Sequence, residues 1–124
     1  MVEINKCLDT YALMEIARAN PKFVSYLNSS FVITDLNLAE FYSVLLRENG
    51  ENLADYWIKK LERYSLPVSK EILIAAIKFR FDNRKTNISF FDAVGYIYSI
   101  KNGFYFVTGD KEFEKFKNVE FVKK

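Results

Sequence analysis

Two patterns of apolar residues alternate along the chain. Short, nearly continuous apolar runs are typical of strands buried on both faces, whereas apolar residues that recur every three or four positions are typical of amphipathic helices. The short runs predict strands at 2–8, 31–34, 66–68, 104–107 and 119–122. The helical spacing predicts helices at 11–19, 35–50, 52–64, 70–80, 89–101 and 111–116.

Strands and helices therefore alternate along the whole sequence, without a linker, repeat or low-complexity segment. This alternation is typical of a mostly parallel sheet with helices on both faces, so we expect a three-layer α/β/α sandwich formed by one domain over residues 1–124. Such sheets bind ligands at the carboxyl ends of their strands, where Asp9 and Asp110 are both predicted to lie. Gly109, just before Asp110, is expected to let the backbone turn sharply through an unusual φ.

The residue types that are missing narrow the possible chemistry. The chain has no histidine, which excludes Ser-His-Asp and Cys-His triads and the common histidine zinc sites. Its single cysteine, Cys7, excludes disulfides within the chain and thiolate metal clusters. The four glycines form neither of the common nucleotide-binding loop motifs. Any catalysis must therefore depend on carboxylates, lysine, tyrosine or hydroxyl groups.

The sequence contains no predicted membrane segment. Its longest apolar run, 72–77, is much shorter than the roughly 20 residues that span a bilayer. The first residues lack the apolar core of a secretory signal. We therefore expect a soluble, cytoplasmic protein that does not contact a membrane.

Four acidic residues are candidates for a site, although each also has an ordinary structural interpretation. Asp9 and Asp110 follow predicted strands, but Asp is also a common helix N-cap. Ser89 and Asp92 fit a capping box, yet the same helix face continues through small and polar residues along which a ligand could lie, so both interpretations stay open. Glu40 lies opposite the main apolar stripe of its helix, and its spacing alone favours a solvated face.

Taken in order, four segments of the sequence resemble the PIN domain. They are LDT at 8–10, LAEF at 38–41, SFFDAVGY at 89–96 and FVTGDKEF at 106–113. The length, element order and spacing are similar over essentially the whole chain, and most narrowly to the small VapC-like toxin ribonucleases of this family. The resemblance implies a PIN-like fold and a metal-dependent endoribonuclease that cleaves single-stranded or looped RNA.

The resemblance assigns roles to six positions. It implies that Thr10 and Thr108 support the neighbouring acids by orienting carboxylates or a water. Hard oxygen ligands favour Mg²⁺ or Mn²⁺ over zinc where no imidazole or thiolate is present. The resemblance implies that one or two such ions are bound by four acids, which are both catalytic and metal-binding: Asp9, Glu40, Asp92 and Asp110.

Contact with RNA is less clearly encoded, because the formal net charge is only +2. The basic cluster beside Asp110, which consists of Lys111, Lys115 and Lys117, is the better candidate, since phosphate must be bound next to the metals. A second basic cluster lies at 78–85. The segment 82–87, which overlaps its end, matches nothing in the family pattern. The resemblance further implies a homodimer and a small antitoxin protein as partners.

Two other functions stay open. A receiver-like phosphoacceptor domain also binds Mg²⁺ at strand ends, but it needs paired acids after the first strand and a lysine closing a late strand. Leu8-Asp9 and Val107-Thr108 do not supply these residues. A non-catalytic adaptor on the same fold, which would bind a partner through apolar surface, is the second alternative.

Overall fold

The structure, a computed structural model, describes residues 5–123. In this range β1 pairs in parallel with β4, β4 with β5, and β2 with β3. A parallel bridge between Cys7 and Val32 joins the two groups, which gives the order β3-β2-β1-β4-β5. The strands are β1 (Lys6–Leu8), β2 (Ile33–Thr34), β3 (Ser65–Leu66), β4 (Tyr105–Thr108) and β5 (Val119–Phe121).

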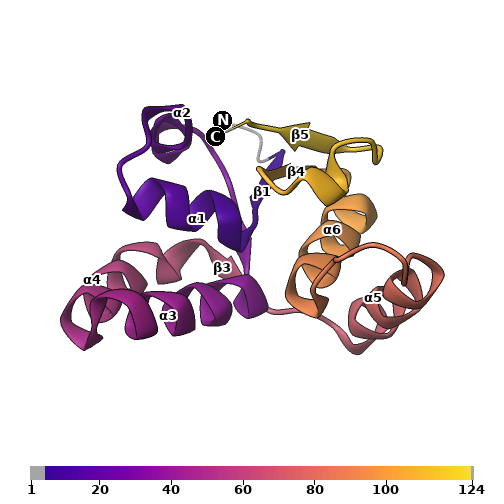
Figure 1. Cartoon of the computed structure of the whole chain (residues 1–124), viewed down its shortest axis with the longest axis horizontal. Coiled ribbons are helices and arrows are strands. Elements are labelled where there is room, and N and C mark those ends of the chain that lie inside the picture. Colours follow the sequence, from indigo (N-terminus) through magenta and orange to yellow (C-terminus); the bar gives the residue numbers. More distant parts are fainter. Residues whose placement is uncertain (1–4, 124) are drawn as a thin grey trace.

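Helices connect these strands (Figure 1). Among the described residues, no helix is both long and apolar enough to cross a membrane. Short 3₁₀ turns at Ser25–Asn28, Glu62–Tyr64 and Lys111–Phe113 complete the connections. The α-helices are α1 (Thr10–Ala17), α2 (Pro21–Val24), α3 (Asp35–Asn49), α4 (Glu51–Leu61), α5 (Lys70–Asp82) and α6 (Phe90–Asn102).

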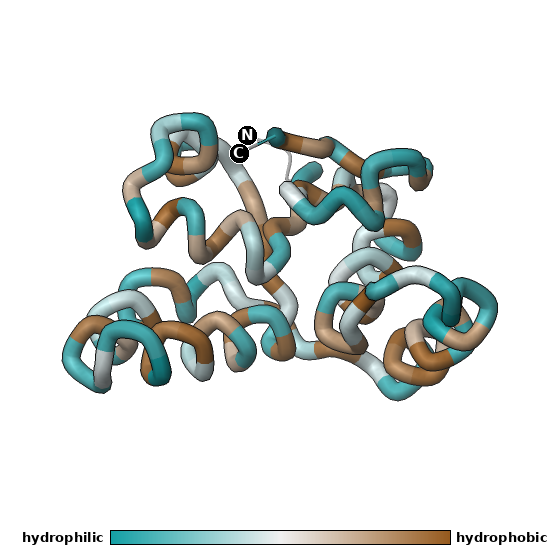
Figure 2. The backbone as a smooth tube through the Cα atoms, in the orientation of Figure 1, coloured by the Kyte–Doolittle hydropathy of each residue, from teal (hydrophilic) through white to brown (hydrophobic). Residues whose placement is uncertain are grey.

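Neighbouring residues in each strand contribute to two different cores. Leu8 and Val107 lie in a buried cluster with residues of α1 to α4, whereas Cys7 and Phe106 lie in a second cluster with residues of α5 and α6. Since successive strand residues point to opposite faces of a sheet, the two groups of helices cover opposite faces. Along these helices hydrophilic and hydrophobic residues follow one another in short bands (Figure 2). The expected three-layer α/β/α fold is thus confirmed.

Most predicted elements agree with the structure to within a few residues, and the differences are local. Residues 2–4 of the first predicted strand lie outside the described range. The helix predicted at 111–116 is a 3₁₀ turn over Lys111–Phe113. Between the helix at 11–19 and the strand at 31–34 the sequence predicted no further element. Instead the Asn20 side chain accepts a bond from the Lys22 amide at 3.1 Å and Pro21 begins α2, a position that suits proline's fixed φ.

Gly109 is needed for space and not for its backbone angles. The glycines with positive φ in the described range are Gly50 and Gly103, so the expected turn through an unusual φ at Gly109 is wrong. A Cβ on Gly109 would instead lie only 2.1 Å from Cε1 of Tyr11. The Tyr11 ring therefore packs directly on the backbone that precedes Asp110.

A polar contact attaches the edge strand β5 to the rest of the molecule. Lys6 Nζ donates to Glu120 Oε1 at 2.7 Å, and the Tyr26 hydroxyl donates to Oε2. Partial burial acts to raise the pKa of Glu120, but the bonds from Lys6 and Tyr26 outweigh it and the pKa is lowered. The ionised carboxylate therefore stabilises the position of β5.

Glu120→Gln is expected to lower the free energy of unfolding near pH 7, because an amide cannot pair with the Lys6 ammonium. For a pair whose side chains are a quarter to a third exposed, the loss should not exceed about 1 kcal/mol. The pKa of Glu120 is lower in the folded state than in the unfolded state. Its contribution to the free energy of unfolding is therefore fully present above the unfolded pKa of about 4.3, and it is lost as the pH falls through the folded pKa. Denaturant unfolding should thus show a difference that narrows from pH 7 to pH 3.

The control is Glu114→Gln, at an exposed position without an ion pair among residues 5–123. It should be neutral across the same pH series. A Glu120→Gln difference that is equally large at pH 7 and pH 3 would show that the contact is not electrostatic.

Candidate active site

Asp9 lies where β1 ends and α1 begins. Its side chain is fully buried, and Oδ1 accepts a hydrogen bond from the Ala12 amide at 2.8 Å. The second oxygen, Oδ2, is buried without a hydrogen-bond partner among the described residues. Buried polar atoms are nearly always paired, so the capping role accounts for only half of this carboxylate.

Asp110 lies at the same edge of the sheet. Leu8 and Val107 are paired in the parallel ladder, and the Asp9 amide donates to the Val107 carbonyl at 3.2 Å. Thr108, the last residue of β4, accepts a bond from the Asp110 amide through Oγ1 at 3.0 Å. The parallel register therefore brings the residues that follow both strands to one place, as the sequence predicted.

Asp92 is in the first turn of α6, but the hydroxyl of Ser89 forms the cap. Ser89 Oγ accepts a bond from the Asp92 amide at 3.1 Å. The Asp92 carboxylate instead faces Asn37, whose Nδ2 donates to Oδ1 at 3.4 Å. The bond between Ser89 and the Asp92 amide is one half of the predicted capping box, and the Asp92 carboxylate also contacts Asn37 on α3, so each of the two interpretations left open by the sequence has a contact in the structure.

Asn37 is a central residue of this region that the sequence analysis missed. It is fully buried, and its Nδ2 also donates to Thr10 Oγ1 at 3.0 Å. Its Oδ1 accepts a bond from the Thr34 hydroxyl at 3.0 Å. A Cβ on Gly95 would lie 2.5 Å from this Oδ1, so glycine lets α6 approach α3 closely. The signal in the sequence was a polar residue on the buried side of α3, one turn before Glu40.

The four acids share one electrostatic environment. Burial raises the pKa of Asp9 well above its ordinary value, and the charges of Asp92 and Asp110 raise it further, against the effect of the Thr108 hydroxyl and the Ala12 amide. Burial also raises the pKa of Asp92 to about 7, with Glu40 and Asp110 adding to the shift. The acids predicted from the sequence therefore come from four separate elements and repel one another.

The donor set suits a hard divalent cation. Within residues 5–123 no three acidic, cysteine or histidine side chains come close enough to form a complete metal cage. Mg²⁺ does not need one, because it keeps several waters and is usually bound by one or two carboxylates together with substrate phosphate. The unpaired Oδ2 of Asp9 and the oxygen-only composition of the cluster fit such an ion.

The predicted supporting residues differ in their relation to the acids. Thr10 is buried within the Asn37 network, and Lys111 lines a cavity of about 440 Å³ together with Asp110 and Tyr11. Lys115 and Lys117 are exposed and do not line this cavity. Of the three lysines proposed for RNA contact, Lys111 is thus the one placed beside the acidic cluster.

Comparison with known proteins gives a family match and several structural likenesses. A family model described as the PIN domain matches residues 6–119. No curated protein matches the chain at the level of sequence. Several solved structures are similar to this chain, but each shares less than 25% of its residues with it, so the similarity concerns the fold.

Three of these structures cover nearly the whole chain. VapC20 of Mycobacterium tuberculosis, described as a toxin that cleaves the sarcin-ricin loop, is 17% identical with a TM-score of 0.80 over 96% of this chain and 99% of that one. A toxin–antitoxin complex from Klebsiella pneumoniae is 13% identical with a TM-score of 0.74, over 96% and 99%. VapBC2 of Rickettsia felis, bound to a DNA fragment from its promoter, is 18% identical with a TM-score of 0.71, over 98% and 99%.

Asp92→Asn is expected to raise the melting temperature in EDTA at pH 8. Above the raised pKa of about 7 the carboxylate is ionised, and its charge is buried and repelled by its neighbours. Asparagine keeps the shape and removes that charge, and a gain of about 1 kcal/mol corresponds to roughly 3–6 °C for a chain of this length. The variant should also gain less stability than the wild type from added Mn²⁺.

Thermal melts in EDTA and across a Mn²⁺ titration measure both effects. Glu62→Gln is the control, because it removes an exposed carboxylate that has no ion pair among residues 5–123 and lies in the 3₁₀ turn before β3, outside the cluster. A lower melting temperature for Asp92→Asn in EDTA would mean that its charge mainly stabilises the start of α6.

Proposed function

This chain belongs to the PIN domain family, and from that premise we propose that it is a metal-dependent endoribonuclease. Its substrate is single-stranded or looped RNA, and its cofactor is Mg²⁺ or Mn²⁺. The sequence resemblance to the VapC-like members and the structural likeness to VapC proteins support a toxin of the toxin–antitoxin type.

The observation that supports this proposal is the electrostatic effect of the acids on one another: the charges of Asp92 and Asp110 act on Asp9, and those of Glu40 and Asp110 act on Asp92. Asp9 is fully buried and the other three acids are partly exposed, so repulsion within the cluster costs stability, and perturbed carboxylates of this kind occur most often at functional sites. The buried, unpaired Oδ2 of Asp9 supplies a specific ligand atom for a cation. A non-catalytic adaptor would gain nothing from such an arrangement.

The residues around the acids have separable tasks. When bound, a divalent cation supplies Lewis-acid polarisation of a phosphoryl oxygen and lowers the pKa of a bound water. Asp9 and Asp92 would hold it, and Asn37 fixes the orientation of Asp92 and Thr10. Lys111, exposed beside Asp110, would bind a substrate phosphate.

We extend the proposal to two partners and a compartment. VapC-like proteins are expected to form homodimers and to be inhibited by a small antitoxin, and one structural neighbour is described as a toxin–antitoxin complex. Apolar side chains that remain exposed on α3 and α4, among them Leu46 and Tyr56, are available for such contacts. Dimerisation and binding of the antitoxin would both take place in the cytoplasm.

Asp9→Asn is expected to reduce cleavage of a structured RNA pool by at least about 100-fold, because it removes the negative charge of the buried ligand. Wild-type cleavage should require Mg²⁺ or Mn²⁺ and stop in excess EDTA. Gel analysis of end-labelled RNA measures both, with far-UV circular dichroism to verify folding and Glu62→Gln, at an exposed position away from the acids, as the control. Wild-type cleavage that continues at full rate in EDTA would contradict the proposal.

Thr108→Val keeps the shape of the side chain and removes the hydroxyl that accepts a hydrogen bond from the Asp110 amide. Residues that orient a metal ligand typically contribute about 10–100-fold, so we expect activity reduced by that factor and restored by Thr108→Ser. Initial rates at saturating Mn²⁺ measure the loss. Complete inactivity of a folded Thr108→Val variant would instead make Thr108 a direct ligand.

A further inference from the structure

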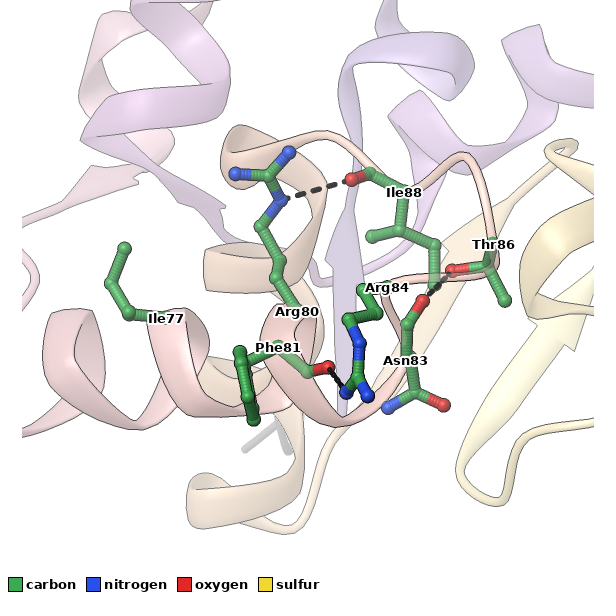
Figure 3. A pocket seen from close by; sticks show the side chains of 7 residues that line it. All are labelled: Ile77, Arg80, Phe81, Asn83, Arg84, Thr86 and Ile88. Atoms are coloured by element: carbon green, nitrogen blue, oxygen red, sulfur yellow. Dashed lines mark hydrogen bonds between the residues drawn. The ribbon is translucent and has the colours of Figure 1, made fainter.

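The end of α5 and the loop after it enclose a second cavity of about 300 Å³, outside the acidic cluster (Figure 3). The last residue of α5 and this loop include the segment 82–87, for which the family resemblance gave no role. The side chains that line this cavity include Ile77, Arg80, Phe81, Arg84, Thr86 and Ile88.

Two guanidinium groups are held in place at this cavity. Arg80 Nε donates to the Ile88 carbonyl at 3.0 Å, and Arg84 Nη1 donates to the Phe81 carbonyl at 3.0 Å. The Arg84 guanidinium also lies over the Phe81 ring, 4.7 Å from its centroid. Each of these bonds uses one nitrogen, and a guanidinium has five N–H donors, so both groups keep donors for a ligand.

The positive charge of this cavity is not neutralised locally. No acidic side chain lines the cavity, and neither Arg80 nor Arg84 forms an ion pair within residues 5–123. Lys78, one turn earlier on α5, differs in this respect because its Nζ lies 3.0 Å from Asp82 Oδ2. Arg80 and Arg84 are therefore available to an anion at this cavity, and the exposed Lys85 beside Arg84 adds a further positive charge.

The same loop touches the acidic site. The Ile88 carbonyl that holds Arg80 precedes Ser89, the cap of α6, and Asp92 follows four residues after Ile88. Four residues span at most about 14 Å. On its other side the loop donates the Asn87 amide to Glu112 Oε1 at 3.1 Å, and Asn87 lines the cavity that contains Asp110.

We propose that this arginine cavity, formed by Arg80, Arg84 and Phe81, binds a phosphodiester of the RNA strand outside the catalytic acids. This inference rests on the proposed function. Fixed guanidinium groups suit phosphate oxygens, and Phe81, whose side chain is 64% exposed, offers a surface on which a flanking base stacks. The loop 82–88 would then guide the strand toward Asp92 and Asp110.

The salt dependence of RNA binding tests this subsite. Binding of a labelled single-stranded RNA is measured by fluorescence anisotropy in EDTA between 50 and 200 mM KCl, in an Asp9→Asn background that prevents cleavage. Arg80→Gln and Arg84→Gln should each weaken binding and lower the slope of log K against log salt by about 0.7, the value for one lost contact to a single strand. Arg84→Lys, which keeps the charge, should keep the slope.

The matched control is Arg47→Gln, which makes the same charge change at the exposed end of α3 and should leave the slope unaltered. Slopes of both glutamine variants equal to that of the control would overturn the proposal. Two other results would also overturn it. In one, a mononucleotide binds as tightly as the RNA strand and is weakened equally by the arginine variants. In the other, the variants lose affinity for a polyglutamate probe but not for RNA.

Failure of this subsite and failure of the proposed function give different results. If the wild type cleaves RNA with Mn²⁺ while the arginine variants keep the control slope, the subsite is wrong and the nuclease assignment stands. If the wild type does not cleave RNA but the arginine variants show the lowered salt slope, the subsite stands and the catalytic assignment is wrong.

Discussion

Asp9 is buried with one carboxylate oxygen paired and the other unpaired, and the surrounding structure is arranged around that charge. The parallel pairing of β1 with β4 fixes Asp9 and Asp110 at one edge of the sheet. The start of α6 adds Asp92, and α3 adds Glu40, so two further elements bring negative charges toward this edge. A carboxylate in such a place is costly unless a cation or proton compensates it. The fold thus creates a site whose charge a bound cation would balance.

Neutral polar groups keep this cluster in place. Asn37 connects Thr34 at the end of β2, Thr10 at the start of α1 and Asp92 at the start of α6 through one side chain. An amide can do this because it both donates and accepts, whereas another charge would add to the repulsion. Gly95 completes the arrangement, since any larger residue would displace the Asn37 oxygen. The position of Asp92 therefore depends on uncharged neighbours.

Much of this could be predicted from the sequence, because it follows from local rules. Apolar periodicity determined the strands and helices, and the rule that parallel strands end at one edge brought Asp9 and Asp110 together. The remaining features depend on contacts between segments far apart in the chain. The role of Gly109 depends on where the Tyr11 ring packs, and that of Asn37 on how close α6 lies to α3. Neither is visible in spacing along one element.

The net charge of +2 conceals how the charges are distributed. Acids converge at the edge of the sheet, while Arg80 and Arg84 lie without acidic partners around the loop that leads to α6. A uniformly basic surface would bind RNA anywhere on the molecule, and its cations would lower the affinity of the acids for a metal. Separating the two signs over a short distance would let the arginines bind phosphate beside a negative site. A cation bound at the acids would then make that site attractive to the strand as well. Substrate binding and metal binding would then favour each other.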